Sequence, residues 1–158
     1  MKKLLMMLTM FMVTMAANAQ FEEGTKYIGA SLTNVGLSYN GADKLNLGIQ
    51  AKVGYFVQDG WQINALAGFE HHNPSFNALT VGAGLRYYIV DNGFFVGAGA
   101  KCVFANARND VMPGIELGYA FYISESLAIE PAVYYDQSFH SHSDYSTVGI
   151  KIGLGYFF

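Results

Sequence analysis

One polar segment near the C-terminal end brings together side chains that perform hydrolytic chemistry. It runs His140-Ser141-His142-Ser143-Asp144, so hydroxyl, imidazole and carboxylate groups stand within five consecutive residues. In serine hydrolases a histidine takes the proton of the attacking serine and an acid orients that histidine. A polar, serine-rich loop accounts for the same residues without catalysis. We favour the loop and expect no enzymatic activity, with attack on a lipid ester as the catalytic alternative.

The four histidines form a second candidate site. His71 and His72 stand in one expected loop, and His140 and His142 stand in another. A histidine pair from each loop would suit a transition metal if the loops met. Nothing in the sequence brings the loops together, so we expect solvated histidines and no cofactor.

Isolated charged residues inside otherwise apolar segments form the third candidate. Each stands on a different segment, and four are positive while two are negative. If the segments form an eight-stranded barrel, its interior is just filled by its own side chains, so we expect these residues to pair across it as a structural core. The alternative is a narrow conduit with a slight preference for anions. The six residues are Lys52, Arg86, Lys101, Glu116, Glu130 and Lys151.

These segments alternate apolar and small or polar residues with a period of two, which predicts β-strands. In the last segment Val148, Ile152 and Phe158 share one face while Lys151 lies on the other. Each segment is long enough to cross a bilayer as a tilted strand, which takes about 9–11 residues. A polar leader over residues 21–26 precedes eight expected strands. The strands cover 27–38, with a bulge near Asn34, then 44–57, 61–70, 77–90, 93–104, 111–123, 126–136 and 145–158.

Composition decides which face of the sheet meets water. The chain is 52% hydrophobic and only 13% charged, whereas a soluble barrel needs a surface with about 25–35% charged residues. We therefore predict an all-β, antiparallel, up-and-down transmembrane barrel with its apolar face outward. Inward glycines make room for Tyr88, Phe95, Tyr122 and Tyr134, which favours a plugged interior.

Connection lengths predict the orientation. Tight turns at 58–60, 91–93 and 124–125 alternate with longer connections at 39–43, 71–76, 105–110 and 137–144. Outer-membrane barrels have short periplasmic turns and longer external loops, so both termini are expected in the periplasm. Outward aromatic residues near the strand ends are expected to form the two interfacial girdles. These are Tyr55, Trp61, Tyr87 and Phe94 toward the periplasm and Phe69, Phe104 and Tyr135 toward the outside.

The first nineteen residues have the pattern of a secretory signal. Lys2 and Lys3 precede an apolar run over 4–15, and Ala17-Asn18-Ala19 offers a cleavage site. We expect a signal peptide at 1–19 and a barrel domain at 20–158. Cleavage leaves seven basic against twelve acidic residues, which disfavours binding to nucleic acid. Cys102 has no partner for an internal disulfide and is interpreted as a small apolar residue.

The C-terminus supplies the most specific motif. Gly153, Tyr156 and Phe158 match a signal with glycine, an aromatic three positions later and a terminal aromatic, although Ile152 stands where a polar residue is common. On this motif and the strand pattern, residues 20–158 resemble the small outer-membrane β-barrel family of Gram-negative bacteria, the porin-like or OmpX-like group. The resemblance implies an outer-membrane location and recognition by the barrel-assembly machinery.

The expected function is that of a non-enzymatic barrel with a plugged or very narrow lumen. It would act in envelope structure or in surface interaction through its loops, with membrane lipid and an unknown extracellular ligand as partners. A small-solute or ion channel is the first alternative, and an enzyme that modifies lipid A at the outer rim is the second.

Overall fold

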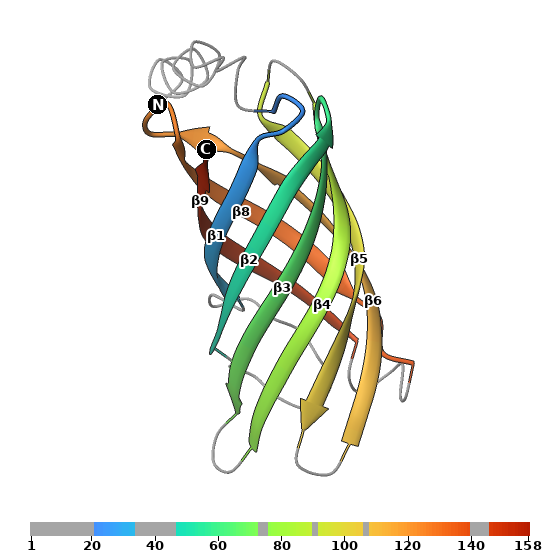
Figure 1. Ribbon diagram of the computed structural model, residues 1–158. Helices are drawn as coiled ribbons and strands as arrows, with labels where there is room; N and C mark the ends of the chain where they lie inside the picture. The colour runs from blue at the N-terminus through green and yellow to red at the C-terminus, as the bar shows by residue number, and fades with distance from the viewer. Residues whose placement is uncertain (1–20, 34–46, 73–75, 90–91, 106–107, 140–145) are drawn as a thin grey trace, which may run out of the picture.

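The chain folds into strands that wind around one axis (Figure 1). The computed structural model describes residues 21–33, 47–72, 76–89, 92–105, 108–139 and 146–158. This part of the chain contains no helix long and apolar enough to cross a membrane. Its strands are β1 (Lys26–Thr33), β2 (Leu47–Gln58), β3 (Trp61–His72), β4 (Phe76–Tyr88), β5 (Phe94–Ala105), β6 (Arg108–Tyr119), β7 (Phe121–Tyr122), β8 (Leu127–Asp136) and β9 (Thr147–Phe157).

Antiparallel pairing closes the sheet into a barrel. Strands β1 to β5 each pair with the next strand along the chain, and β1 also pairs with β9. Strand β9 pairs with β8, and β8 pairs in turn with both β7 and β6, which closes the sheet. The predicted antiparallel up-and-down barrel is confirmed. Strands β6 and β7 together form one continuous wall segment, and each such segment is called a stave, so the nine strands make eight staves. The stave of β6 and β7 is interrupted at Ala120, whose backbone N–H donates to the carbonyl oxygen of Gly93 at 2.8 Å.

The strand bounds differ from the prediction at several ends. The strand expected over 111–123 starts at Arg108 and is interrupted at Ala120. The interruption lies between the Gly118–Ala132 and Phe121–Ile129 pairs, where β8 carries Pro131, which has no backbone N–H to donate. The last strand begins at Thr147. The bulge expected near Asn34 and the signal peptide expected at 1–19 lie outside the described residues.

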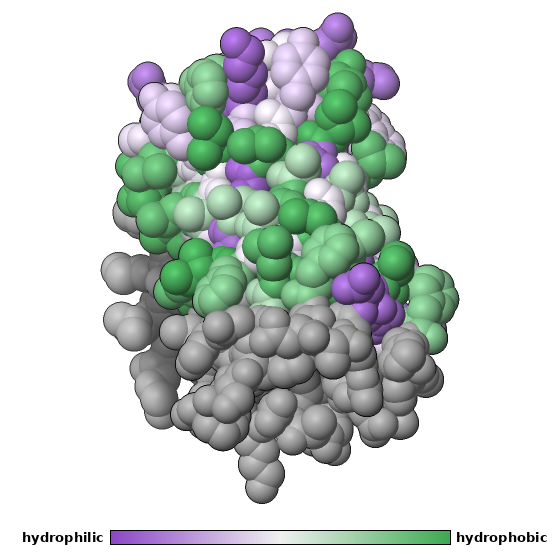
Figure 2. Space-filling model, turned by 60° about the horizontal axis from the view of Figure 1, so that its bottom comes forward, coloured by the Kyte–Doolittle hydropathy of each residue, from purple (hydrophilic) through white to green (hydrophobic). Residues whose placement is uncertain are grey.

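The two faces of the sheet differ as the alternation predicts. Outward residues such as Ile49 and Ile115 are about 60% exposed, at 62% and 60%, whereas the inward Phe56, Tyr88 and Phe95 are fully buried. The wall in Figure 2 is mostly hydrophobic, and its hydrophilic residues gather mainly at one end. The barrel is therefore apolar outside and filled inside.

Small inward residues leave space for the large ones. A Cβ atom on Gly118 would lie 2.4 Å from the Phe95 ring, and one on Gly149 would lie 2.6 Å from the Tyr134 hydroxyl oxygen. Both distances are below contact, so these positions need glycine for the aromatic side chains to fit. All four predicted inward aromatics, Tyr88, Phe95, Tyr122 and Tyr134, are buried.

Residues 21–25, expected as part of a polar leader, instead help to close one end of the barrel. This is the end at which β1 begins and the C-terminus lies (Figure 1). Phe21 is only 4% exposed and stacks on Tyr88 with ring centroids 4.4 Å apart. It also contacts the rings of Phe56 and Phe157. The Phe21 carbonyl accepts a hydrogen bond from the Gly60 N–H at 2.7 Å, which fixes the segment to the β2–β3 turn.

Replacing Phe21 with alanine should lower the free energy of unfolding by about 3–5 kcal/mol, because it removes a buried aromatic from a packed cluster. Urea titration of the detergent-folded protein measures the change. Phe139→Ala is the matched control, since Phe139 is 71% exposed. Equal stability of the two variants would contradict the packing role of Phe21.

Candidate functional site

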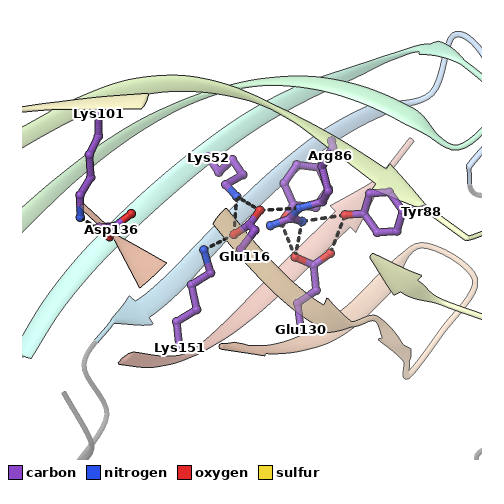
Figure 3. Close-up of polar contacts among 9 residues, drawn as sticks. Lys52, Arg86, Tyr88, Lys101, Glu116, Glu130, Asp136 and Lys151 are labelled. Carbon is purple, nitrogen blue, oxygen red and sulfur yellow. Dashed lines mark hydrogen bonds and ion pairs between the residues drawn. The ribbon is translucent and has the colours of Figure 1, made fainter. Parts of the chain in front are cut away.

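A network of charged side chains crosses the barrel interior and centres on Glu116 (Figure 3). Glu116 Oε1 lies 3.0 Å from Lys52 Nζ and 2.9 Å from Arg86 Nε, and its Oε2 pairs with Lys151 Nζ. The four residues come from β2, β4, β6 and β9, so the contacts tie staves from different sides of the barrel. One carboxylate thus holds three cations.

Arg86 extends the network to a second carboxylate. Its Nη1 lies 2.9 Å from Glu130 Oε2 and donates to the Tyr88 hydroxyl at 2.7 Å. The hydroxyls of Tyr27 and Tyr88 donate to Glu130 at 2.8 and 3.1 Å. Arg86 is only 2% exposed, and its guanidinium carbon lies 4.1 Å from the centre of the Phe95 ring. The guanidinium donates hydrogen bonds in its plane, and the Phe95 ring packs on its face. Together these contacts hold the guanidinium in one orientation.

Lys101 is the one predicted lumen residue that the structure places apart from this network. Its Nζ lies 2.7 Å from Asp136 Oδ2, and both side chains are about 15% exposed, at 15% and 14%. The Tyr134 ring lies close to both the ion pair and the network, with Lys101 Nζ 6.0 Å and Lys151 Nζ 5.5 Å from its centre. The interior therefore contains a five-residue network and a separate ion pair.

Sequence reasoning missed two inward carboxylates. Asp136 follows Glu130 at the inward parity of β8, and Asp110 precedes Glu116 at the inward parity of β6. Asp110 Oδ2 accepts a hydrogen bond from the buried Ser138 hydroxyl. The period-two pattern alone would have found both had it been extended to the strand ends. With them, the described part of the interior has four cations and four carboxylates, so the positive excess of the six predicted residues does not extend to all its described charged groups.

Aromatic side chains fill the interior between the network and the end that carries both β1's start and the C-terminus. The cluster packs ring against ring, and Tyr88 links it to the network through Glu130. A cavity of only about 10 Å³ borders Arg86, Phe95 and Glu130, which is room for about one water molecule. The cluster contains Phe21, Tyr27, Phe56, Tyr88, Phe95, Tyr122 and Phe157.

A larger cavity lies on the other side of the network. Its volume is about 70 Å³, and Lys52, Glu116 and Lys151 line it together with the Lys101–Asp136 pair. Polar side chains of Gln50, Asn64 and Thr33 complete the lining. The space accommodates a small polar solute or a few water molecules, and the charged network forms its floor.

Comparison with known proteins shows which solved structures share this fold. No family model and no curated protein matches the sequence. Among solved structures, the N-terminal β-barrel domain of Pseudomonas aeruginosa OprF superposes with a TM-score of 0.68 at 15% identity, covering 86% of this chain and 98% of that one. This chain has the fold of a small eight-stranded outer-membrane β-barrel.

Two further outer-membrane barrels agree. Yersinia pestis Ail in a phospholipid bilayer nanodisc gives a TM-score of 0.60 at 16% identity over 86% of this chain and 100% of that one. Neisserial surface protein A gives 0.63 at 10% identity, covering 85% and 96%. The strand pattern and the C-terminal motif therefore predicted the fold correctly, although identity is low throughout.

The predicted girdle residues of the outer-membrane barrel lie on the outward face. Six of them are exposed and Tyr135 is half-buried, and the Trp61 and Tyr87 rings lie 4.8 Å apart on neighbouring strands. The predicted girdle positions are Tyr55, Trp61, Tyr87, Phe94, Phe69, Phe104 and Tyr135.

The C-terminal motif lies on the strand that closes the barrel. Tyr156 and Phe158 point outward with ring centroids 5.7 Å apart, while Gly153 is buried beside Ser31. The Phe158 backbone exchanges two hydrogen bonds with Lys26, at 2.7 and 2.9 Å. The last residue thus joins the two ends of the sheet.

The other candidates fall where side chains are not described. His71 and His72 end β3, but their side chains lie outside the described part of the chain. His140, Ser141, His142, Ser143 and Asp144 lie outside it altogether, so the metal and hydrolase hypotheses stay as predictions.

Arg86→Met should cost about 3–5 kcal/mol of unfolding free energy, because it leaves Glu130 buried without a cation among the described residues. Lys101→Met should cost less, about 1–3 kcal/mol, since Asp136 is more exposed than Glu130. Urea titration of the folded barrel gives both values, with the exposed Lys26→Met as control. An Arg86→Met variant as stable as this control would show that the network is not structural.

Proposed function

We propose that this protein is an integral outer-membrane barrel with a sealed lumen. In this view it has no enzymatic activity and acts in envelope structure or in surface interaction through its loops. The observation that carries the proposal is that two separate groups of side chains fill the interior. A charged network spans the barrel, and an aromatic cluster that includes Phe21 lies between it and one end.

The outward face supports insertion into a membrane. Large apolar side chains are exposed on every stave, from Ile28 on β1 to Leu154 on β9. An exposed apolar surface of this extent is unfavourable in water but matches the hydrocarbon of a bilayer. Closure also pairs the backbone groups of every stave, which is the condition for strands to lie in lipid.

We infer that the end with the tight turns and the C-terminus faces the periplasm. Gly60 and Gly93 make those turns with positive φ angles of 75°. Short turns mark the periplasmic side of such barrels. The partners would then be outer-membrane lipid and, during biogenesis, the barrel-assembly machinery, which would recognise Gly153, Tyr156 and Phe158.

Surface interaction has support from one structural neighbour. Ail is described as the attachment invasion locus protein of Yersinia pestis, and one of its structures contains the heparin analogue sucrose octasulfate. By analogy, the external connections of this chain would carry any extracellular ligand. The sealed interior leaves these connections and the apolar wall as the surfaces available for function.

The alternative function is a channel for small solutes or ions. The cavity of about 70 Å³ favours it, because this cavity is lined by charged and polar groups. A conducting path would need to continue past Glu116, Arg86 and the aromatic cluster. Tight packing around Arg86 opposes that continuation.

Single-channel recording in a planar bilayer separates the two functions. The refolded protein, confirmed as a barrel by heat-modifiable migration on a gel, should give no discrete conductance steps. The double variant Phe21→Ala, Arg86→Ala should give steps, because it removes one side chain from each obstruction. Phe139→Ala serves as the silent control.

Reproducible steps from the unmodified barrel would overturn the sealed lumen. If those steps also changed ion selectivity when Arg86 or Lys101 was neutralised, the protein would be a channel through its polar interior.

A further inference from the structure

The five-residue network does not balance its own charge. It contains three cations, Lys52, Arg86 and Lys151, and two carboxylates, Glu116 and Glu130. All five side chains are at most 12% exposed. The network therefore holds an excess of one positive charge in the barrel interior.

The other described inward carboxylates do not pair with the network. Asp110 accepts a hydrogen bond from the Ser138 hydroxyl and does not line the cavity beside the network. Asp136 is neutralised by Lys101 at 2.7 Å, so that pair contributes no net charge. The tyrosines that contact Glu130 donate hydrogen bonds to it and bring no negative charge. An uncompensated buried charge costs several kcal/mol, so a counter-ion beside the network would stabilise the fold.

The large cavity lies where such a counter-ion is needed. Lys52 and Lys151, the two cations that share Glu116, both line it. Asn64 and Gln50 offer amide groups and Thr33 offers a hydroxyl, all of which can donate hydrogen bonds. Its volume of about 70 Å³ admits an ion the size of a halide together with water.

We propose that this cavity binds one small monovalent anion, a halide or a short carboxylate, held by the ammonium groups of Lys52 and Lys151. The charge of the ligand follows from the excess of one. A cation is disfavoured because both carboxylates that line the cavity, Glu116 and Asp136, are already paired with lysine or arginine. The site would be a structural ion site, and it does not depend on whether the lumen conducts.

Chloride binding can be measured through its effect on stability. The folded barrel is titrated with urea in a zwitterionic detergent at fixed ionic strength, while chloride replaces the bulky anion isethionate. A ligand that binds only the folded state raises the unfolding midpoint as its concentration rises. The unmodified protein should show that rise, and bromide in a crystal should give an anomalous peak beside Lys52 and Lys151.

Two variants make the test specific. Lys52→Gln leaves two cations against two carboxylates, so the rise with chloride and the bromide peak should both disappear. The double variant Lys101→Gln, Asp136→Asn removes a neutral pair from the same cavity and should keep both. Heat-modifiable migration confirms that each variant folds.

A midpoint independent of chloride in the unmodified protein would overturn the proposal, and would mean that a lysine loses its proton instead. Chloride dependence that persists unchanged in folded Lys52→Gln would also overturn it.

Discussion

Closure of the sheet is the constraint on which the rest of this structure depends. A strand with unpaired backbone N–H and C=O groups is costly in hydrocarbon, so β1 must pair with β9 on one side and β2 on the other. Eight staves give an interior only wide enough for side chains. The outward face is then left to lipid and the inward face to a small, crowded core. The glycines, the charges and the aromatic cluster all follow from this division.

The crowded interior explains why Arg86 is central. Polar side chains that point inward cannot reach bulk water, so each needs a partner across the barrel. Arg86 has donors in several directions and joins Glu116, Glu130 and Tyr88 in one arrangement. A lysine has a single charged nitrogen and could not hold the same three partners in a fixed plane. The network thereby fixes the relative positions of staves that are far apart in the sheet.

Period-two alternation was enough to predict the staves, their faces and the inward position of all six charged residues. It identified Tyr88 and Phe95 as filling side chains because glycines occupy the same parity around them. The residues it missed lie where alternation ends. Asp136 is the last residue of β8 and Asp110 the third residue of β6, and the break at Ala120 lies where the neighbouring strand β8 carries Pro131.

Phe21 shows the same limit more clearly. It precedes the first strand among polar neighbours, so its sequence context gives no sign of burial. Its position is set by the backbone contact with Gly60 and by space between Phe56, Tyr88 and Phe157, which exists only once the barrel has closed. Similarly, the partners within the network required three-dimensional register, since pairing across a lumen leaves no mark on residue spacing.

The claim that lipid covers the outward face is tested most directly at Trp61, the only tryptophan in the chain. It is 42% exposed, points outward and lies near the end of β3 that joins the tight turn. In vesicles, lipids brominated near the headgroup should quench its fluorescence more strongly than lipids brominated near the bilayer centre, and aqueous iodide should quench it weakly. Strong quenching by iodide without quenching by either lipid would contradict a membrane-spanning barrel.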